Sequence, residues 1–212
     1  MNRLRELSNQ VMDVYQELSL EFGTYQHSQG LSCIEKCGAC CNKPDIEVSP
    51  LEMLPYALHL FDTGQAEDVY HDLEYYNGFA CKQYQRTSLD GKEGFCSIYE
   101  YRPGICRMFG AAGYTTKHGE ATLSVCKPIK NAVPDKYANA LIAINTLSHD
   151  GQNKNVAKVR PPMIALGRQR LSQLDYELGE RLMPINAALR YILEKILTTS
   201  YYANSDDDGV AA

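Results

Sequence analysis

The chain has little of what would place it in or across a membrane. No run of roughly 18 apolar residues, the length that a membrane-spanning helix needs, occurs in its 212 residues. Its N-terminus reads MNRLREL and continues with recurring charges, so the apolar segment of a signal peptide is missing. We therefore expect no signal peptide, no membrane association and a cytoplasmic location.

Basic charge is also scarce. Lys and Arg together number 21 against 26 Asp and Glu, which gives a formal net charge of −5, and no Lys/Arg run interrupts the sequence. A protein that binds a phosphate backbone is usually basic. The composition therefore argues against a nucleic acid as a partner.

Familiar catalytic motifs are absent. The five histidines form neither an H-x3-H pair nor an H-E-x-x-H motif, which excludes a catalytic zinc site of that kind. No G-x-S-x-G, P-loop or G-x-G-x-x-G motif occurs either. Whatever chemistry the chain performs must come from other residues.

The periodicity of apolar residues predicts several helices. With 44% hydrophobic and 22% charged residues, the chain can form an ordinary core, as one large domain or one domain with helical extensions. We expect the first helix over residues 3–27, ended by Gly30. Ser49-Pro50 with Glu52 has the pattern of a capping box, which predicts a helix to about Asp62. Further helices are expected over residues 65–76, 134–148, 162–178 and 184–199.

The middle of the chain is poor in periodicity. Residues 79–112 are rich in glycine and cysteine and suit short helical turns, while residues 113–125 predict a β-hairpin around His118-Gly119. The expected fold class is mainly α, with an irregular cysteine-rich metal-binding segment and a short β-hairpin packed among helices. We expect an N-terminal helix (1–29), a cysteine-cluster metal-binding domain (30–130), C-terminal helices packed on it (131–203) and a disordered tail (204–212), with a polar linker at 150–160.

Cysteine is the one residue type that is concentrated. Seven of the eight cysteines lie between residues 33 and 106, and four of them fall within nine residues, CIEKCGACC. In a reducing cytosol such density indicates metal or redox chemistry rather than disulfides. A disulfide between the neighbours Cys40 and Cys41 would also be strained.

A plainer interpretation treats these cysteines as the apolar side of a helix. The first four stand at i, i+4, i+7 and i+8, and a free cysteine behaves as a small hydrophobe. Gly38 and Pro44 do not favour a long helix there. We therefore prefer metal binding, for which thiolates are suitable ligands of a soft ion or cluster.

The spacing allows one site or two. A C-x2-C step lets two thiolates reach one ion or cluster. Adjacent cysteines usually point apart, so Cys40 and Cys41 are expected not to bind the same ion. We predict Cys37, Cys40, Cys96 and Cys106 as one quartet. The remaining four would form a second site or support the first: Cys33, Cys41, Cys81 and Cys126.

Two arginines flank the last cysteine of this segment. A four-thiolate site carries about −2 net charge with Zn²⁺ or an oxidised four-iron cluster, and the guanidinium groups of Arg102 and Arg107 would offset that charge. The alternative for both is surface ion pairing with Glu100 or Glu93. Pro103-Gly104 would turn Cys106 back towards Cys96, or simply start a helix.

The cysteines also carry a resemblance. The Cys-Gly-Ala-Cys-Cys core follows Cys33 and is followed by Cys81 and a second block, Cys96-x2-Tyr99-x2-Arg102-Pro103-x2-Cys106-Arg107-x-Phe109. Over about residues 30–127 this order resembles the YkgJ-type cysteine-cluster family, also described as the CxxCxxCC or zinc- or iron-chelating domain. The resemblance implies a bound zinc or iron–sulfur cluster. The family includes bacterial flagellin lysine methylases, for which it implies a four-iron cluster taking part in methyl transfer. This chain is short and shows no obvious additional catalytic domain.

Three functional classes follow from these observations. The protein could hold a metal for structure, storage or sensing. It could be a cluster-dependent enzyme of methyl transfer or redox chemistry, or a zinc-stapled interaction scaffold whose terminal helices bind a protein partner. Arg-flanked thiols, adjacent thiols and more than four cysteines favour an iron–sulfur cluster of the four-iron (4Fe-4S) type, with zinc as the alternative.

Overall fold

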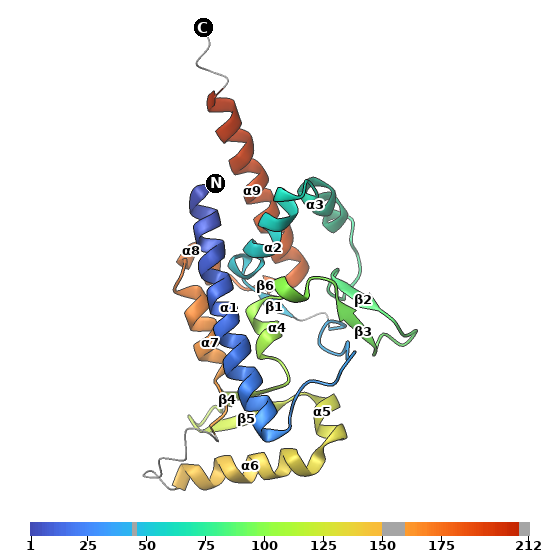
Figure 1. Ribbon diagram of the computed structural model, residues 1–212, viewed down its shortest axis with the longest axis vertical. Coiled ribbons are helices and arrows are strands. Elements are labelled where there is room, and N and C mark those ends of the chain that lie inside the picture. Colours follow the sequence, from blue (N-terminus) through green and yellow to red (C-terminus); the bar gives the residue numbers. More distant parts are fainter. Residues whose placement is uncertain (44–45, 150–159, 208–212) are drawn as a thin grey trace.

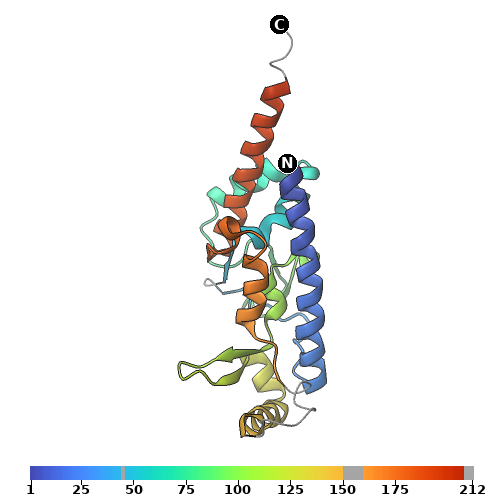
Figure 2. The same cartoon turned by 90° about the vertical axis from the view of Figure 1, so that its left-hand side faces the viewer.

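The computed structural model describes residues 1–43, 46–149 and 160–207, and it has the mainly helical architecture expected from the sequence. Figures 1 and 2 show an elongated molecule in which the first helix, α1, runs along the long axis. Strands occur only as short antiparallel pairs. None of the described helices is both long enough and apolar enough to cross a membrane.

The helices are best given together. They are α1 (Asn2–Gln29), α2 (Pro50–Asp62), α3 (Ala66–Glu74), the 3-10 turn η1 (Tyr99–Tyr101), α4 (Gly104–Met108), α5 (Lys127–Ala132), α6 (Pro134–His149), α7 (Ile164–Ser172), α8 (Tyr176–Gly179) and α9 (Ile185–Asp207). The strand pairs are β1 (Glu47–Val48) with β6 (Met183–Pro184), β2 (Tyr84–Arg86) with β3 (Gly94–Cys96), and β4 (Ala111–Thr115) with β5 (Ala121–Val125).

Helix α1 forms because its apolar residues recur every three or four positions and bury one stripe. Val11, Tyr15, Leu18 and Phe22 on this stripe are fully buried. The helix ends at Gly30, which adopts the left-handed conformation with φ 62° and caps the last carbonyl groups. The predicted first helix and its glycine end are thereby confirmed.

Helix α2 is the centre of the fold and packs against both α1 and α9. The predicted capping box is present, because Ser49 accepts from the Glu52 amide and the Glu52 carboxylate accepts from the Ser49 amide. Nearly all residues of α2 are buried, so the helix lies inside the fold with other elements packed around it. It anchors the part of the chain that comes directly after the first four cysteines.

The apolar side chains form one main core and a smaller second core. The main core is built chiefly by α1, α2, α4 and α9. The second core lies under the β4–β5 hairpin, where Tyr25, Leu31, Leu123 and Ile144 pack together. In Figure 1 this hairpin and α6 lie at the opposite end of the molecule from the C-terminal end of α9.

The hairpin predicted over residues 113–125 is confirmed as β4–β5, and a second hairpin, β2–β3, was not predicted. The helix expected over residues 162–178 is wrong as a single element, because the chain turns at Gln173 and Asp175 caps a separate short helix, α8. The last helix extends beyond residue 199 to Asp207, so the start of the expected disordered tail is helical. Residues 150–159 of the predicted linker (150–160) and residues 208–212 of the predicted tail (204–212) lie outside the described residues.

Candidate metal centre

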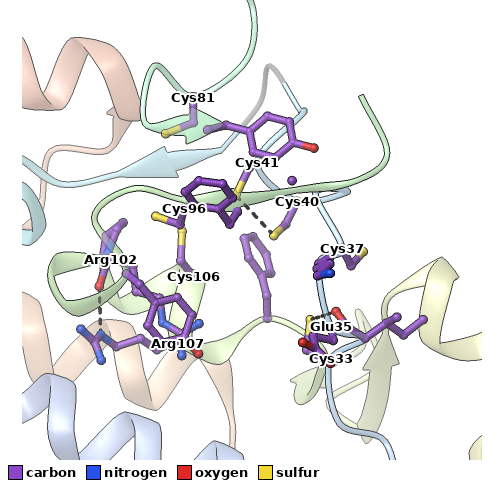
Figure 3. A pocket seen from close by; sticks show the side chains of 18 of the residues that line it. Cys33, Glu35, Cys37, Cys40, Cys41, Cys81, Cys96, Arg102, Cys106 and Arg107 are labelled. Carbon is purple, nitrogen blue, oxygen red and sulfur yellow. Dashed lines mark hydrogen bonds between the residues drawn. The ribbon is translucent and has the colours of Figure 1, made fainter. Parts of the chain in front are cut away.

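Seven of the eight cysteines line one pocket. Its volume is about 680 Å³, and its walls come from the segment after α1, the β2–β3 hairpin, η1 and α4. The exception is Cys126, which lies between β5 and α5. Figure 3 shows the thiols spread along this pocket, with Cys33 and Cys37 on one side and Cys96 and Cys106 on the other. We call residues 31–43 the cluster loop.

The cluster loop is extended and turned rather than helical, which rules out the plainer interpretation of its four cysteines as one helix face. Lys36 has φ 58°, a left-handed conformation uncommon outside glycine. Backbone hydrogen bonds join the loop to the hairpin, from the Gly38 amide to the Lys92 carbonyl (2.9 Å) and from the Gly94 amide to the Lys36 carbonyl (3.0 Å). The loop is therefore held by β2–β3 and not by its own secondary structure.

Close approach requires glycine at position 38. A Cβ atom there would overlap the ring and hydroxyl of Tyr84. The Tyr84 hydroxyl in turn donates to the Gly91 carbonyl at 2.9 Å in the turn between β2 and β3. The glycine of the Cys-Gly-Ala-Cys-Cys core thus lets the cluster loop lie directly against the hairpin.

The segment that carries Cys81 is fixed from two directions. The Cys81 amide donates to the Cys41 carbonyl at 3.1 Å. On either side of it, Asn186 at the start of α9 accepts from the Lys82 amide (2.9 Å) and donates to the Ala80 carbonyl (3.0 Å). One side chain from the C-terminal helix therefore holds the backbone around this buried thiol.

Helix α4 carries Cys106 and is held by Glu52. The Ile105 amide donates to Oε1 of Glu52 at 3.2 Å, while Oε2 of the same carboxylate accepts from the Ser49 amide at 2.9 Å. Burial raises the pKa of Glu52, although the hydrogen bonds from Ser49 and Ile105 oppose this shift. The buried carboxylate thus joins the start of α2 to the start of α4.

Cys40 and Cys41 correct one expectation. Their sulfur atoms lie 4.0 Å apart, so the two side chains do not point away from each other. The hydrogen bond between them lowers the pKa of the Cys40 thiol and raises that of Cys41. Two thiolates bound to the same tetrahedral zinc ion, each at about 2.3 Å from it, lie about 3.8 Å apart. The Cys40 and Cys41 sulfur atoms therefore have the separation expected of two ligands of one ion.

Five thiols form what we call the inner group: Cys40, Cys41, Cys81, Cys96 and Cys106. Desolvation raises the pKa of Cys81 to about 11 and raises those of Cys96 and Cys106, with a further contribution from charge on Cys40 in each case. Because like charges this close oppose one another, the inner group needs a cation to hold several thiolates at once.

The other three thiols, Cys33, Cys37 and Cys126, form the outer group. Burial raises the pKa of Cys33 to about 11, followed by charge on Cys40, Cys37 and Cys126. Burial also raises the pKa of Cys126, and charge on Cys37 raises it further. Its amide donates to the Gly110 carbonyl at 2.9 Å, which fixes the end of β5.

All four cysteines of the predicted quartet line the pocket, and their binding of one metal together stays a prediction. Cys40, Cys96 and Cys106 lie in the inner group, whereas Cys37 lies with the outer one, and Cys41 and Cys81 join the inner group instead. Among the described residues, no three His, Cys, Asp or Glu side chains stand close enough together to hold a single ion as placed. The assignment of the eight cysteines as ligands stays a prediction, and their thiol chemistry fits a soft metal.

The two predicted arginines differ in their surroundings. Arg107 is fully engaged: its guanidinium donates to the carbonyls of Arg102 and Glu100 and to Ser19, and lies 4.5 Å from the centre of the Tyr15 ring. Arg102 stacks on Tyr99 at 4.1 Å and faces the pocket. Within the described residues, neither forms the ion pair with Glu93 or Glu100 that was the alternative.

Sequence reasoning missed the residues that hold the site rather than line it. Asn186 carried no signal, because its partners lie about a hundred residues earlier in the chain. Tyr84 was one of many tyrosines near the cysteines. The sequence predicted Glu52 as part of a capping box. Its contact with α4, made by the other carboxylate oxygen, was not predicted.

Comparison with known proteins gives one match. Residues 32–128 match the model of the family described as "CxxCxxCC: Putative zinc- or iron-chelating domain". No curated protein matches the chain, and no solved structure matches it. The matched segment contains all eight cysteines, both hairpins and α4, so it includes every wall of the thiol-lined pocket apart from α1 and the start of α9. Residues 32–128 therefore match a family described as a zinc- or iron-chelating domain, and this match supports metal binding by this part of the chain.

Proposed function

We propose that this protein is an iron–sulfur protein in which the inner group of thiols holds a four-iron cluster. One observation carries the proposal: five thiols from four separate segments surround a single pocket of about 680 Å³. A structural zinc ion takes four ligands around one point, whereas the thiolates of a four-iron cluster each bind a different iron and stand around a larger volume.

The charge of the site supports the same proposal. The pKa values of Cys81, Cys96 and Cys106 are all raised by burial, so without a cation these thiols keep their protons at neutral pH. A bound metal reverses this preference, and its binding releases protons. Positive charge on Arg102 lowers the pKa values of Cys40 and Cys96, which favours the thiolate form that metals bind. An iron–sulfur cluster in this place would supply one-electron chemistry.

Zinc is the second candidate, and the Cys40–Cys41 pair favours it. A sulfur separation of 4.0 Å agrees with the value of about 3.8 Å expected for two thiolates on one tetrahedral zinc. Cys81 and Cys106, the remaining thiols that influence Cys41, would then complete a four-thiolate site. This arrangement leaves Cys96 as a spare thiol.

The interaction-scaffold alternative required an exposed apolar stripe on a terminal helix. The stripe of α1 is buried in the main core, and so are Leu189, Ile192 and Leu193 of α9. Leu20 on α1 and Tyr201 and Tyr202 near the end of α9 are exposed, but they do not form a stripe along residues 4–25 or 184–199, so we do not propose a protein partner on these helices. Because bound thiolates require a reducing compartment, we infer a cytoplasmic location.

The test is the metal content of protein purified without oxygen. We would measure iron, zinc and acid-labile sulfide per chain and record a visible spectrum. Brown protein with about four irons and four sulfides is the expected result. Colourless protein with zinc and no sulfide would replace the cluster by the second candidate, and protein with neither metal would overturn both.

A further inference from the structure

The pocket is large as well as rich in thiols. Its volume of about 680 Å³ is in the range of sites that bind small organic molecules. Besides the thiols, its walls include Arg102 and the apolar side chains of Ile34 and Phe95, which are not metal ligands.

Arg102 stands on the wall of this pocket with unused hydrogen-bond donors. Its Nε atom is enclosed by protein and has no hydrogen-bond partner, and its two terminal nitrogen atoms, the donors that a ligand could reach, have none among the described residues. Arg107 nearby is held by two carbonyl groups and Ser19. The structure therefore keeps one of the two guanidinium groups occupied and leaves the other free.

Nothing on the described walls of the pocket can fully satisfy this group. The only carboxylate among the lining residues is that of Glu35, which lies beside Cys33, on the far side of the thiols from Arg102 (Figure 3). Thiol sulfur is a weak acceptor, whereas a carboxylate can accept two parallel hydrogen bonds from a guanidinium fork. The unmet donors of Arg102 therefore match a carboxylate better than they match the cysteines.

Three large apolar or aromatic side chains lie at the opening of the pocket, beside the polar residues Ser32, Glu35 and Lys36. They are the side chains of Ile34, Phe95 and Tyr99, which line the pocket and are nevertheless 41%, 57% and 62% exposed. They come from the cluster loop, β3 and η1, so three segments place an apolar group at the same opening. Exposed apolar side chains gathered around a pocket are typical of a binding site.

We propose that the pocket binds a small organic carboxylate beside the metal. The carboxylate group accepts hydrogen bonds from Arg102, and the apolar body of the molecule packs against Ile34, Phe95 and Tyr99. The inference rests on the proposed function only in that the metal occupies the thiol side of the pocket. It adds a ligand site that a purely structural metal centre does not need.

The test uses benzoate as the probe and benzamide as its neutral counterpart of the same shape. Binding to the metal-loaded protein is measured by isothermal titration calorimetry, with metal content determined on the same samples. We expect benzoate to bind and benzamide to bind at least about tenfold more weakly, since charge-assisted hydrogen bonds are lost. Arg102→Gln should weaken benzoate by about tenfold per metal-loaded chain, and the metal content of the variant is measured on the same sample because Arg102 also lowers the pKa values of Cys40 and Cys96.

The matched control is Arg181→Gln. Arg181 also stacks on a tyrosine, Tyr191 at 5.3 Å, but it lies outside the pocket, so its replacement should leave benzoate affinity unchanged. Equal affinity for benzoate and benzamide, or an unaffected Arg102→Gln variant, would overturn the carboxylate site while metal binding stands. Loss of metal in Arg102→Gln would instead show that Arg102 serves the thiolates. Wild-type protein that holds no metal would overturn the proposed function but not the carboxylate site. Titrating benzoate into that metal-free protein would then test whether Arg102 binds a carboxylate.

Discussion

The inner and outer groups of thiols belong to one domain but are held in different ways. The backbone around Cys81 is fixed by Cys41 and Asn186, and the helix of Cys106 is fixed by Glu52. By contrast, Cys33 is exposed, and Cys37 follows a residue in the left-handed conformation. Long-range hydrogen bonds therefore fix the backbone around Cys81 and Cys106 in advance, whereas Cys33 and Cys37 depend on the cluster loop.

The largest effect should come from removing single thiols of the two groups. Cys106→Ala in the inner group should lower the metal content strongly, because it removes one of the five thiols that surround the proposed metal. Cys126→Ala in the outer group should retain most of the metal. Metal content per chain after anaerobic purification gives the comparison directly. Equal losses from every cysteine variant would mean that the division into two groups is incorrect.

Glycine 38 offers a way to break the contact that both groups share. Gly38→Ala places a methyl group against the Tyr84 ring, so the cluster loop must move away from β2–β3. We expect a loss of about 1–3 kcal/mol in the free energy of unfolding, together with weaker metal binding. Urea unfolding of the metal-free protein measures the first effect. Gly23→Ala in α1 is the control, because its backbone is helical and no atom lies within 4 Å of the added methyl group, so the free energy of unfolding should not fall.

The buried carboxyl group of Glu52, which holds the helix of Cys106, should make the free energy of unfolding depend on pH. Since burial raises the folded-state pKa of Glu52 above its ordinary value of 4.5, its contribution to stability is fully present below that value and is lost as pH rises through the folded-state pKa. Gln has no such titration. The free energy of unfolding of wild type relative to Glu52→Gln should therefore fall as pH rises from 4.5.

Urea unfolding of both metal-free proteins at several pH values checks this trend. A constant difference between them would contradict it. Glu35→Gln, at an exposed carboxylate beside the outer group, should unfold at the same urea concentration as wild type.

The smallest change is expected from Tyr84→Phe. It keeps the ring that packs on Gly38 and removes only the hydrogen bond to the Gly91 carbonyl. A loss of about 1 kcal/mol in the free energy of unfolding is expected, with metal content unchanged. A large loss of metal would show that the hairpin turn, and not the ring contact, positions the cluster loop.

The sequence predicted those parts of the fold that local signals determine. The stripe of α1, the glycine that ends it and the capping box of α2 each depend on residues within one or two turns. The hairpin β2–β3 was missed because its strands have three residues each and Gly94 and Cys96 are poor indicators of a strand. The break between α7 and α8 was missed because the cap at Asp175 falls inside a continuous apolar pattern.

The candidate site was predictable in its chemistry and not in its grouping. Cysteine spacing and flanking arginines indicated a thiol-bound metal, and the matched family agrees at the level of metal chelation. Which thiols meet depends on contacts between segments far apart, such as Asn186 with the backbone around Cys81. The different roles of Arg102 and Arg107 likewise depend on Ser19 of α1, which no local pattern connects to them.

The contact of Asn186 also has a consequence for the order of assembly. The cysteines all precede residue 127, yet the backbone around Cys81 is completed by a side chain from the start of α9. During synthesis the ribosome therefore releases every thiol well before the last wall of the pocket exists, since domains form as units once their chain is available. Metal delivered early would meet an unfinished pocket, so the finished protein, rather than the growing chain, is the form suited to receive it.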